Sequence, residues 1–338
     1  MFEIRVLSKE DIRCVMDMKS ILESAERVYR AKSRGKTAVW PTVFYEFCQG
    51  KADLDIKSGW LKEEALFGHK TVTCFEDNGA KGVPKMAGVI VIYSADTGVP
   101  LAVLEASYLT GARTGAAGAL GAKYLARPNS QNLLLVGTGR QAVFQAAAML
   151  VAFPGLERIT AVNPVNFQQC REFVDTLGQR LKNEFGLTCK DVCIQAGENL
   201  KQAVSQSDIV ITVTPSRKPL IQREWVRPGT HISCIGADMP GKQELSPQIL
   251  KDSRLYADDK PHCMEAGEME LALKAGVIQE MDILGELGDV MEGKCPGRLG
   301  PDDITVFDAT GMALLDIAAA KTALELAAAK GLGTIAHL

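Results

Sequence analysis

Small residues at fixed spacing mark a phosphate-binding turn near the middle of the chain. An apolar run, NLLLV, leads into Gly137, Gly139 and Ala142, and an alanine-rich run follows. Gly137 allows a tight turn, Gly139 lets a pyrophosphate approach the backbone at a helix N-terminus, and Ala142 lets helix and strand pack closely. The flanks predict a strand buried on both faces over 133–136 and a helix after the turn. They favour a dinucleotide site over a purely structural glycine turn.

Two basic residues lie among apolar or small residues, where a substrate carboxylate could bind. In GHKTVTCF, strand alternation places Lys70 on one face with Val72 and Cys74. A partly desolvated lysine can bind a carboxylate or carbonyl, or exchange protons near neutrality. Arg113 lies in the glycine- and alanine-rich helix expected over 110–126, and its forked guanidinium suits a carboxylate. A strand-end lysine reaching water and a helix-surface arginine remain the alternatives.

An aspartate follows a later apolar strand. The strand expected over 231–235 leads into GADMPGKQEL, so Asp238 lies just past a strand end, where doubly wound sheets bind their ligands. Its carboxylate could accept or deliver a proton or pair with an amine, and an Asx turn is the alternative.

The elements that must position these residues follow two patterns. Helical spacing after Ser8, with Asp11 completing a cap and Gly35 as a stop, predicts an N-terminal helix. Short apolar stretches then predict an antiparallel sheet, with turns at 77–79 and 96–98, the second closing a hairpin. From residue 132 strands alternate with helices. The expected strands cover 133–136, 158–163, 191–195, 208–214, 231–235, 254–257 and 305–307, and the expected helices cover 140–153, 167–185, 200–205 and 312–330.

This order predicts an α/β protein with a Rossmann-type, doubly wound parallel sheet and a second, α+β domain built on the antiparallel sheet. The net charge of -3 and the scattered basic residues exclude the electrostatic footprint of nucleic-acid binding. No apolar segment is long enough for a membrane span, and the N-terminus does not read as a signal peptide. The nine cysteines are odd in number and lack zinc spacing, so we expect buried free thiols, no metal and a cytoplasmic protein.

Together these segments resemble the ornithine cyclodeaminase and mu-crystallin family over nearly the whole chain. The matching segments are GHKTVT with Lys70, LTGARTGAAGALGAKYLAR with Arg113, VGTGRQA, IGADMPGKQEL with Asp238, and FDATGMALLD. The resemblance implies a homodimer. It also implies a substrate-binding and dimerisation domain over 1–120 and 312–338, and a nicotinamide-binding domain over 121–311.

The resemblance also bears on activity. Family members include cyclodeaminases, alanine dehydrogenases, imino acid reductases and the hormone-binding mu-crystallins, and IGADMPGKQEL is especially similar to the archaeal alanine dehydrogenases. We expect an oxidoreductase that moves hydride between NAD or NADP and the alpha carbon of a small 2-imino or 2-amino acid. Lys70 and Arg113 would hold the carboxylate and polarise the reacting group, and Asp238 would manage the proton on nitrogen. The alternatives are an ornithine cyclodeaminase without net redox and a non-catalytic small-molecule binder.

The chain departs from the family pattern at the expected substrate site. Many members have a P-P-R stretch, whereas Thr42 stands here where the arginine would fall. Where many members have a Met-Pro pair, this chain has Lys57 and Ser58. We therefore expect Lys57 either to replace the lost charge or to hold the second carboxylate of a dicarboxylic imino acid such as iminosuccinate.

A second departure concerns the cofactor. An acidic residue at the end of the second strand normally bonds the adenosine ribose and selects NAD, but Asn163 stands there, with Arg171 two helical turns later. NAD and NADP therefore both remain open. The residues expected to hold the cofactor are Thr114, Gly137, Thr138, Gly139, Arg140, Gln141, Asn163, Thr212, Val213, Thr214, Ser216, Gly236 and Asp238.

Overall fold

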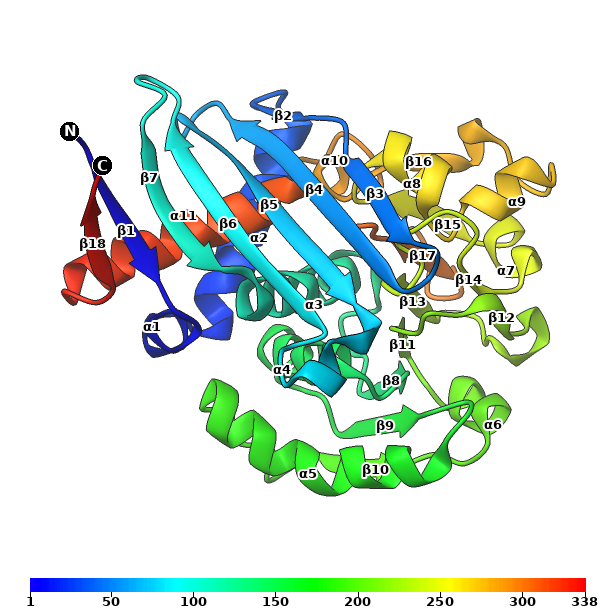
Figure 1. The fold of residues 1–338 in the computed structure, drawn as a ribbon. Coiled ribbons are helices and arrows are strands. Elements are labelled where there is room, and N and C mark those ends of the chain that lie inside the picture. The colour runs from blue at the N-terminus through cyan, green and yellow to red at the C-terminus, as the bar shows by residue number, and fades with distance from the viewer. The chain divides into compact units, whose positions relative to one another are not determined.

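Two compact units make up the chain in the computed structural model, which describes residues 1–338 (Figure 1). Unit 1 contains residues 1–113 and 312–338, and unit 2 contains residues 114–311. The boundary falls inside helix α3 (Ala106–Leu125), so residues 114–120 belong to the second unit. The sequence had led us to expect these residues in the first domain. A long helix can belong to two units because its backbone hydrogen bonds are satisfied locally.

Unit 1 is built on an eight-stranded sheet in the order β18-β1-β7-β6-β5-β4-β2, with β3 also paired to β4. The strands are β1 (Glu3–Leu7), β2 (Thr37–Val39), β3 (Val43–Cys48), β4 (Ala52–Leu61), β5 (Leu66–Phe75), β6 (Met86–Ser94), β7 (Pro100–Glu105) and β18 (Thr334–His337). All pairings are antiparallel except β1 with β7. The predicted hairpin at 96–98 joins β6 to β7, and the predicted turn at 77–79 lies in a short 3-10 helix, η1 (Glu76–Lys81).

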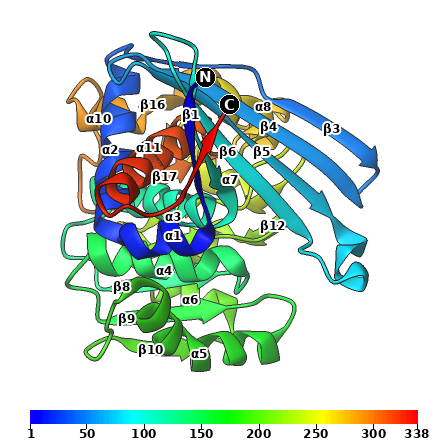
Figure 2. The same cartoon turned by 60° about the vertical axis from the view of Figure 1, so that its left-hand side comes forward.

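Helix α11 (Ala313–Ala329) covers one face of this sheet and contacts β4, β5 and β6 (Figure 2). Close packing is visible at Gly59, where an added Cβ would lie 2.8 Å from the side chain of Leu314. Because alternate residues of a strand point to opposite faces, this contact fixes which side chains of β4 and β5 face α11.

The N-terminal helical segment is two helices rather than the single one we had expected. The capping box between Ser8 and Asp11 opens α1 (Lys9–Val15) as predicted. The side chain of Asp17 then accepts a hydrogen bond from the amide of Ser20 and opens α2 (Met18–Ser33). An aspartate that caps a new helix interrupts the periodic apolar pattern only slightly, so periodicity alone does not detect the break.

Unit 2 is built on a parallel sheet in the order β10-β9-β8-β11-β13-β17-β15-β16. Its strands are β8 (Asn132–Val136), β9 (Arg158–Val162), β10 (Cys193–Ala196), β11 (Ile209–Thr212), β13 (His231–Cys234), β15 (Arg254–Ala257), β16 (Ile283–Glu286) and β17 (Thr305–Asp308). The chain order reverses between β8 and β11, and this is the switch point at which doubly wound sheets bind nucleotides. The predicted Rossmann-type fold is confirmed.

The helices of unit 2 include three that the sequence predicted. They are α4 (Arg140–Ala152), α5 (Phe167–Phe185), which lies beside β9 and β10, and α6 (Leu200–Ser205). The remaining elements were not predicted. They are β12 (Arg217–Ile221), η2 (Arg223–Trp225), β14 (Gln243–Leu245), α7 (Pro247–Lys251), α8 (Lys260–Ala266), α9 (Glu270–Lys274), η3 (Glu280–Asp282), β16 (Ile283–Glu286) and α10 (Leu287–Met291).

The glycines of α3 allow close packing inside unit 2. A Cβ added to Gly115 would lie 2.5 Å from the carbonyl oxygen of Phe144, on α4. One added to Gly121 would lie 2.3 Å from the ring of Phe307, on β17. The small residues thus reflect tight packing rather than weak helix formation.

The cysteines differ from the expectation of buried thiols. Only Cys170, Cys234 and Cys263 are buried, while the others are exposed or partly exposed. Apolar neighbours in sequence do not bury a residue when its strand or helix turns that position outward. No helix combines the length and the apolar character needed to cross a bilayer.

Candidate active site

A buried ion triad lies in unit 1. Lys70 on β5 donates a hydrogen bond from Nζ to Oδ2 of Asp316 at 3.0 Å, and Arg113 on α3 donates from Nε to Oδ1 at 3.1 Å. Lys70 is 3 % exposed, Arg113 6 % and Asp316 0 %. The structure therefore brings together two of the predicted site residues on a carboxylate of α11 that the sequence analysis missed.

The opposite charges of the triad stabilise one another in their buried position. Burial and then the charge of Arg113 lower the pKa of Lys70 to about 8, although Asp316 acts in the opposite direction. Burial opposes ionisation of Asp316, yet the charges and hydrogen bonds of Arg113 and Lys70 bring its pKa below the ordinary value. Two cations share one carboxylate, so near neutral pH the triad carries one net positive charge in a buried place. Such a site favours an anion.

Lys57 lies beside this triad, but Ser58 does not. In the β4–β5 pairing Lys57 is directly opposite Lys70, so both side chains lie on the face that α11 covers. Its charge helps to lower the pKa of Lys70. Ser58 is opposite His69 and lies on the other face of the sheet. The two neighbours that we had grouped together at the substrate site are thus separated by the sheet.

Thr42 is exposed, in the short connection between β2 and β3. The sheet pairing does not place it opposite Lys70. The position of the missing family arginine is therefore filled by a short side chain on the surface of unit 1.

The turn between β8 and α4 has the geometry of a dinucleotide cradle. Gly137 has φ of 110°, and an added Cβ would lie 2.8 Å from the carbonyl oxygen of Val213, so only glycine fits there. A Cβ at Gly139 would meet no heavy atom within 4 Å, which leaves open space beside the backbone. No side chain caps α4, so its first amides are available to a phosphate, and the exposed Arg140 and partly buried Gln141 begin the helix. These residues fit a bound dinucleotide.

Asn163 is held by internal hydrogen bonds. Its Nδ2 donates to Thr138 Oγ1 at 2.9 Å and to Gln169 Oε1 at 3.0 Å, and its Oδ1 accepts from the amides of Val165 and Asn166. These bonds use both donors and the acceptor of the amide. A ribose hydroxyl would have to displace one of them, so Asn163 serves here to tie the glycine turn to the loop after β9.

Asp238 lies in the loop after β13, as expected. Its side chain is 48 % exposed and accepts a hydrogen bond from Lys242 Nζ at 2.5 Å. An exposed carboxylate in this position can exchange protons with a ligand or with water.

The other expected cofactor residues lie in the same unit, on α3, at the end of β11 and in the loops after β11 and β13. Thr212 ends β11, and the amides of Thr214 and Gly236 are bonded to the carboxylate of Glu244 on β14. Ser216 donates its amide to the Thr214 hydroxyl, and the carbonyl of Thr114 accepts from Gln145. The loops after β11 and β13 are thus joined through one buried acid.

Asp316 and Glu244 were not among the residues predicted from the sequence. Asp316 is a lone acid in the apolar run ALLDIAAA, and an acid in such a helix needs a cation beside it, which was a usable signal. Glu244 lies three residues after Gly241 in QEL, and nothing in that short segment predicts that its side chain reaches two other loops.

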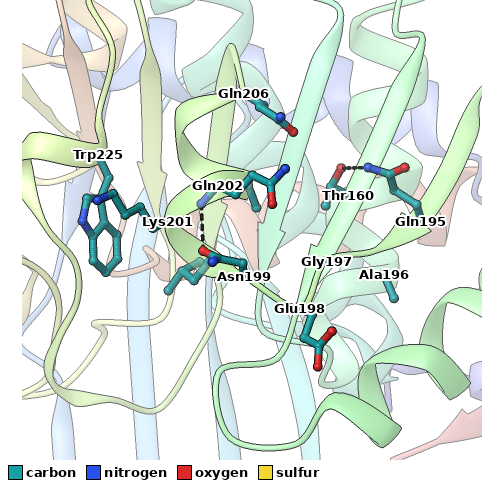
Figure 3. A pocket seen from close by; sticks show the side chains of 12 residues that line it. Thr160, Gln195, Ala196, Gly197, Glu198, Asn199, Lys201, Gln202, Gln206 and Trp225 are labelled. Carbon is teal, nitrogen blue, oxygen red and sulfur yellow. Dashed lines mark hydrogen bonds between the residues drawn. The ribbon is translucent and has the colours of Figure 1, made fainter.

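A cavity of about 740 Å³ lies over β9, β10 and α6 in unit 2 (Figure 3). Gln195 donates a hydrogen bond to Thr160 at 3.1 Å, and the side chain of Asn199 accepts one from the amide of Gln202; both are drawn as dashed lines in Figure 3. None of the expected site residues lines it. No residue of the glycine turn lines it either.

Comparisons with known proteins identify the family of the chain. Residues 3–331 match the model of the ornithine cyclodeaminase/mu-crystallin family. The chain is 37% identical to alanine dehydrogenase of Archaeoglobus fulgidus, over 98% of both chains, and 31% identical to iminosuccinate reductase of Paracoccus denitrificans, over 96% of this chain and 97% of the relative. An archaeal alanine dehydrogenase dimer with bound NAD superimposes with a TM-score of 0.90 at 35% identity, covering 100% of both chains. The expected resemblance is confirmed, and the chain belongs to the ornithine cyclodeaminase/mu-crystallin family.

Proposed function

We propose that this protein is an NAD-dependent oxidoreductase of small 2-imino or 2-amino acids. The observation that carries the proposal is the buried triad of Lys70, Asp316 and Arg113, with its single net positive charge. Such a triad suits one carboxylate, the group that every substrate of this class shares. The dinucleotide turn of unit 2 and the alanine dehydrogenase and iminosuccinate reductase relatives support the redox chemistry.

Each residue has a proposed role. Arg113 binds the substrate carboxylate, and Lys70 donates a hydrogen bond to the carboxylate or to the group that becomes the amine, drawing electron density from the alpha carbon. Asp316 keeps both cations in place. Asp238 takes up or returns the proton on nitrogen. NAD, when bound, accepts or supplies the hydride, and the residues that would hold it begin with Gly137, Thr138 and Gly139.

NAD is the proposed cofactor, because an alanine dehydrogenase at 35% identity holds NAD in its structure. In this chain the side chain of Asn163 is occupied by the glycine turn. It neither repels a 2'-phosphate nor offers it a positive charge, so NADP belongs in the same assay.

Lys57 points to the substrate class. It adds a positive charge directly opposite Lys70 on the same face, beyond the one that a single carboxylate requires. The ammonium group of Lys57 could bind a second carboxylate, so we propose dicarboxylic imino acids of the iminosuccinate type as preferred substrates. Iminosuccinate reductase is among the relatives at 31% identity.

We further propose a homodimer formed through unit 1. Every residue of β3 is exposed, and Val43 (54 %), Phe44 (48 %), Tyr45 (58 %) and Phe47 (56 %) expose large apolar side chains. A monomer rarely leaves such a strand uncovered. The relative of known structure at 35% identity is a dimer. Light scattering should give twice the chain mass, and a monomer at micromolar concentration would contradict this proposal.

The experiment that tests the function is a substrate panel followed at the nicotinamide absorbance. It compares pyruvate and oxaloacetate with ammonia, preformed cyclic imines, alanine and ornithine, each with NAD(H) and NADP(H). Stoichiometric nicotinamide oxidation with an oxo or imino acid supports the proposal. Release of ammonia from ornithine without net nicotinamide reduction would instead identify a cyclodeaminase, and dinucleotide binding without turnover of any substrate would identify a binder.

A further inference from the structure

Glu244 joins the two loops that leave the carboxyl ends of β11 and β13. Its Oε1 accepts the amide of Thr214 at 2.7 Å and its Oε2 accepts the amide of Gly236 at 3.0 Å. The residue itself is on β14 and is 0 % exposed. One carboxylate thus fixes the spacing of two loops that are not adjacent in sequence.

The loops touch at this point. A Cβ added to Gly236 would lie 2.3 Å from the carbonyl oxygen of Thr214 and 2.5 Å from Oε2 of Glu244. The two loops and the carboxylate are therefore packed directly against one another. A change in Glu244 must therefore change the separation of the loops or leave amides without partners.

The strand that carries Glu244 is itself anchored by buried acids. Glu268 accepts the amides of Glu244 and Leu245 at 2.9 and 2.6 Å, and Asp308 accepts the amide of Met269 at 3.1 Å. Glu268 and Asp308 are 0 % exposed. The backbone of Glu244 is therefore fixed by hydrogen bonds, so its carboxylate has a defined position relative to the two loops.

We propose that Glu244 is a positioning residue that sets the loop carrying Asp238 against the cofactor-side loop after β11. The inference rests on the proposed function, since it takes these loops as part of the cofactor site. Glu244 touches neither substrate nor cofactor in this role. It acts through the backbone of Thr214 and Gly236.

The clamp should respond to pH. Burial raises the pKa of Glu244 to about 7, against the hydrogen bonds from Thr214 and Gly236. The titratable groups that its charge reaches are Cys234, Glu268 and Asp308, all of them acidic. Above pH 7 the carboxylate accepts both amides. Below pH 7 the added proton competes with one of them, so the clamp is lost as the pH falls.

The test measures dinucleotide affinity of Glu244→Gln and wild type by fluorescence titration at pH 8 and pH 6, using whichever of NADH and NADPH the wild type binds more tightly. We expect the variant to bind about tenfold more weakly at pH 8, since it loses a charge-assisted acceptor. The gap should shrink to about threefold or less at pH 6, where the wild-type carboxyl is itself protonated. A general loss of packing would give the same gap at both pH values.

Asp208→Asn is the matched control. Asp208 also joins the backbone of neighbouring strands, accepting the amides of Gln131 and Asn132 at 3.1 and 3.0 Å, but it precedes β11 rather than following it. Its pKa is lowered rather than raised, because hydrogen bonds from the Asn132 side chain and nearby amides and the charge of Arg127 outweigh its burial. We expect no pH-dependent gap in affinity for this variant.

A second measurement applies if Glu244→Gln does not fold. Hydrogen exchange of wild-type peptides covering 212–216 and 235–238, corrected for the intrinsic rate, should lose protection between pH 8 and pH 6, while a peptide covering 132–136 should not. Equal affinity of variant and wild type at pH 8, or unchanged protection, would overturn the inference alone. Binding with the expected gap but no turnover would overturn the redox function alone, and a wild type that binds neither dinucleotide contradicts both.

Discussion

Each unit buries carboxylates, and their surroundings move the carboxyl pKa values in opposite directions. In unit 1, Asp316 lies between Lys70 and Arg113, and its pKa falls below the ordinary value even though burial opposes this. In unit 2, burial raises the pKa of Glu244 to about 7 and that of Glu268 well above its ordinary value. The two regions share a residue type and a degree of burial, yet they differ in their partners.

The difference shows what kind of partner keeps a buried acid ionised. Backbone amides donate hydrogen bonds to the buried acids of unit 2, but the charges that neighbour Glu268 and Asp308 are negative. These charges and burial together oppose ionisation. Full positive charges at 3.0 and 3.1 Å do what those amides do not. Unit 1 therefore holds a fixed charge pattern for an anionic substrate, while unit 2 holds acids whose charge changes with pH.

Removing the acid from unit 1 should have the largest effect. Asp316→Asn leaves Lys70 and Arg113 buried without a counter-charge, so we expect a loss of about 3–5 kcal/mol in the free energy of unfolding. Urea denaturation measures it. Glu268→Gln is the matched change in unit 2, and because burial raises the pKa of its carboxyl and so favours the neutral form that glutamine resembles, we expect about 1 kcal/mol or less.

Lys321→Ala controls for the helix that carries Asp316. Lys321 is also on α11, but its ion pair with Glu64 is partly exposed, with side chains 30 % and 22 % exposed, so about 1 kcal/mol or less is expected. If Asp316→Asn and Glu268→Gln were equally mild, the proposed contrast between the two regions would be wrong.

The triad of unit 1 should lose its net positive charge at high pH, whereas the Glu244 carboxylate of unit 2 should lose its negative charge at low pH. Lys70 is protonated below its pKa of about 8, so affinity for an anion falls as the pH rises through that value, by about tenfold per unit. The dissociation constant of pyruvate, which has no group titrating between pH 6 and 10, measures this directly.

Lys70→Arg should keep its charge and bind pyruvate with a nearly constant affinity over that range, whatever its absolute affinity. An alkaline loss that persists in this variant would show that another group causes it.

The smallest expected effect sharpens the comparison inside unit 1. Lys57→Ala should weaken kcat/KM for a dicarboxylic substrate by about tenfold and for a monocarboxylic one by about twofold, because only the former uses the extra charge. Equal losses on the two substrates would contradict the dicarboxylate preference and leave Lys57 as a general source of positive charge. Ser58→Ala, on the other face, should change neither value.

Much of the fold could be predicted from local sequence. The strand before Gly137, the helices α5 and α6, and the hairpin at 96–98 depend on apolar periodicity and turn residues within a few positions. The break at Asp17 and the short elements β12 and β14 could not, because they depend on capping and pairing across larger distances. The unit boundary inside α3 is likewise invisible to periodicity.

The candidate site was predictable in part. Lys70 and Arg113 stood out because a basic residue among apolar neighbours needs an explanation. Their shared partner did not, because Asp316 lies 246 and 203 positions away. The separation of Lys57 from Ser58 by the sheet follows from the strand register, and that register is fixed by packing against α11.

The sequence by itself determined the glycine turn, the alternation of strands and helices, and the residue types able to hold a carboxylate, since these depend on backbone sterics and local periodicity. The tertiary structure decided which charges meet. Asp316 neutralises two buried cations, Glu244 ties two loops together, and Asn163 holds the turn rather than lying free. Protonation and positioning depend on distances of a few ångströms between segments far apart in the chain, and only the folded chain fixes those distances.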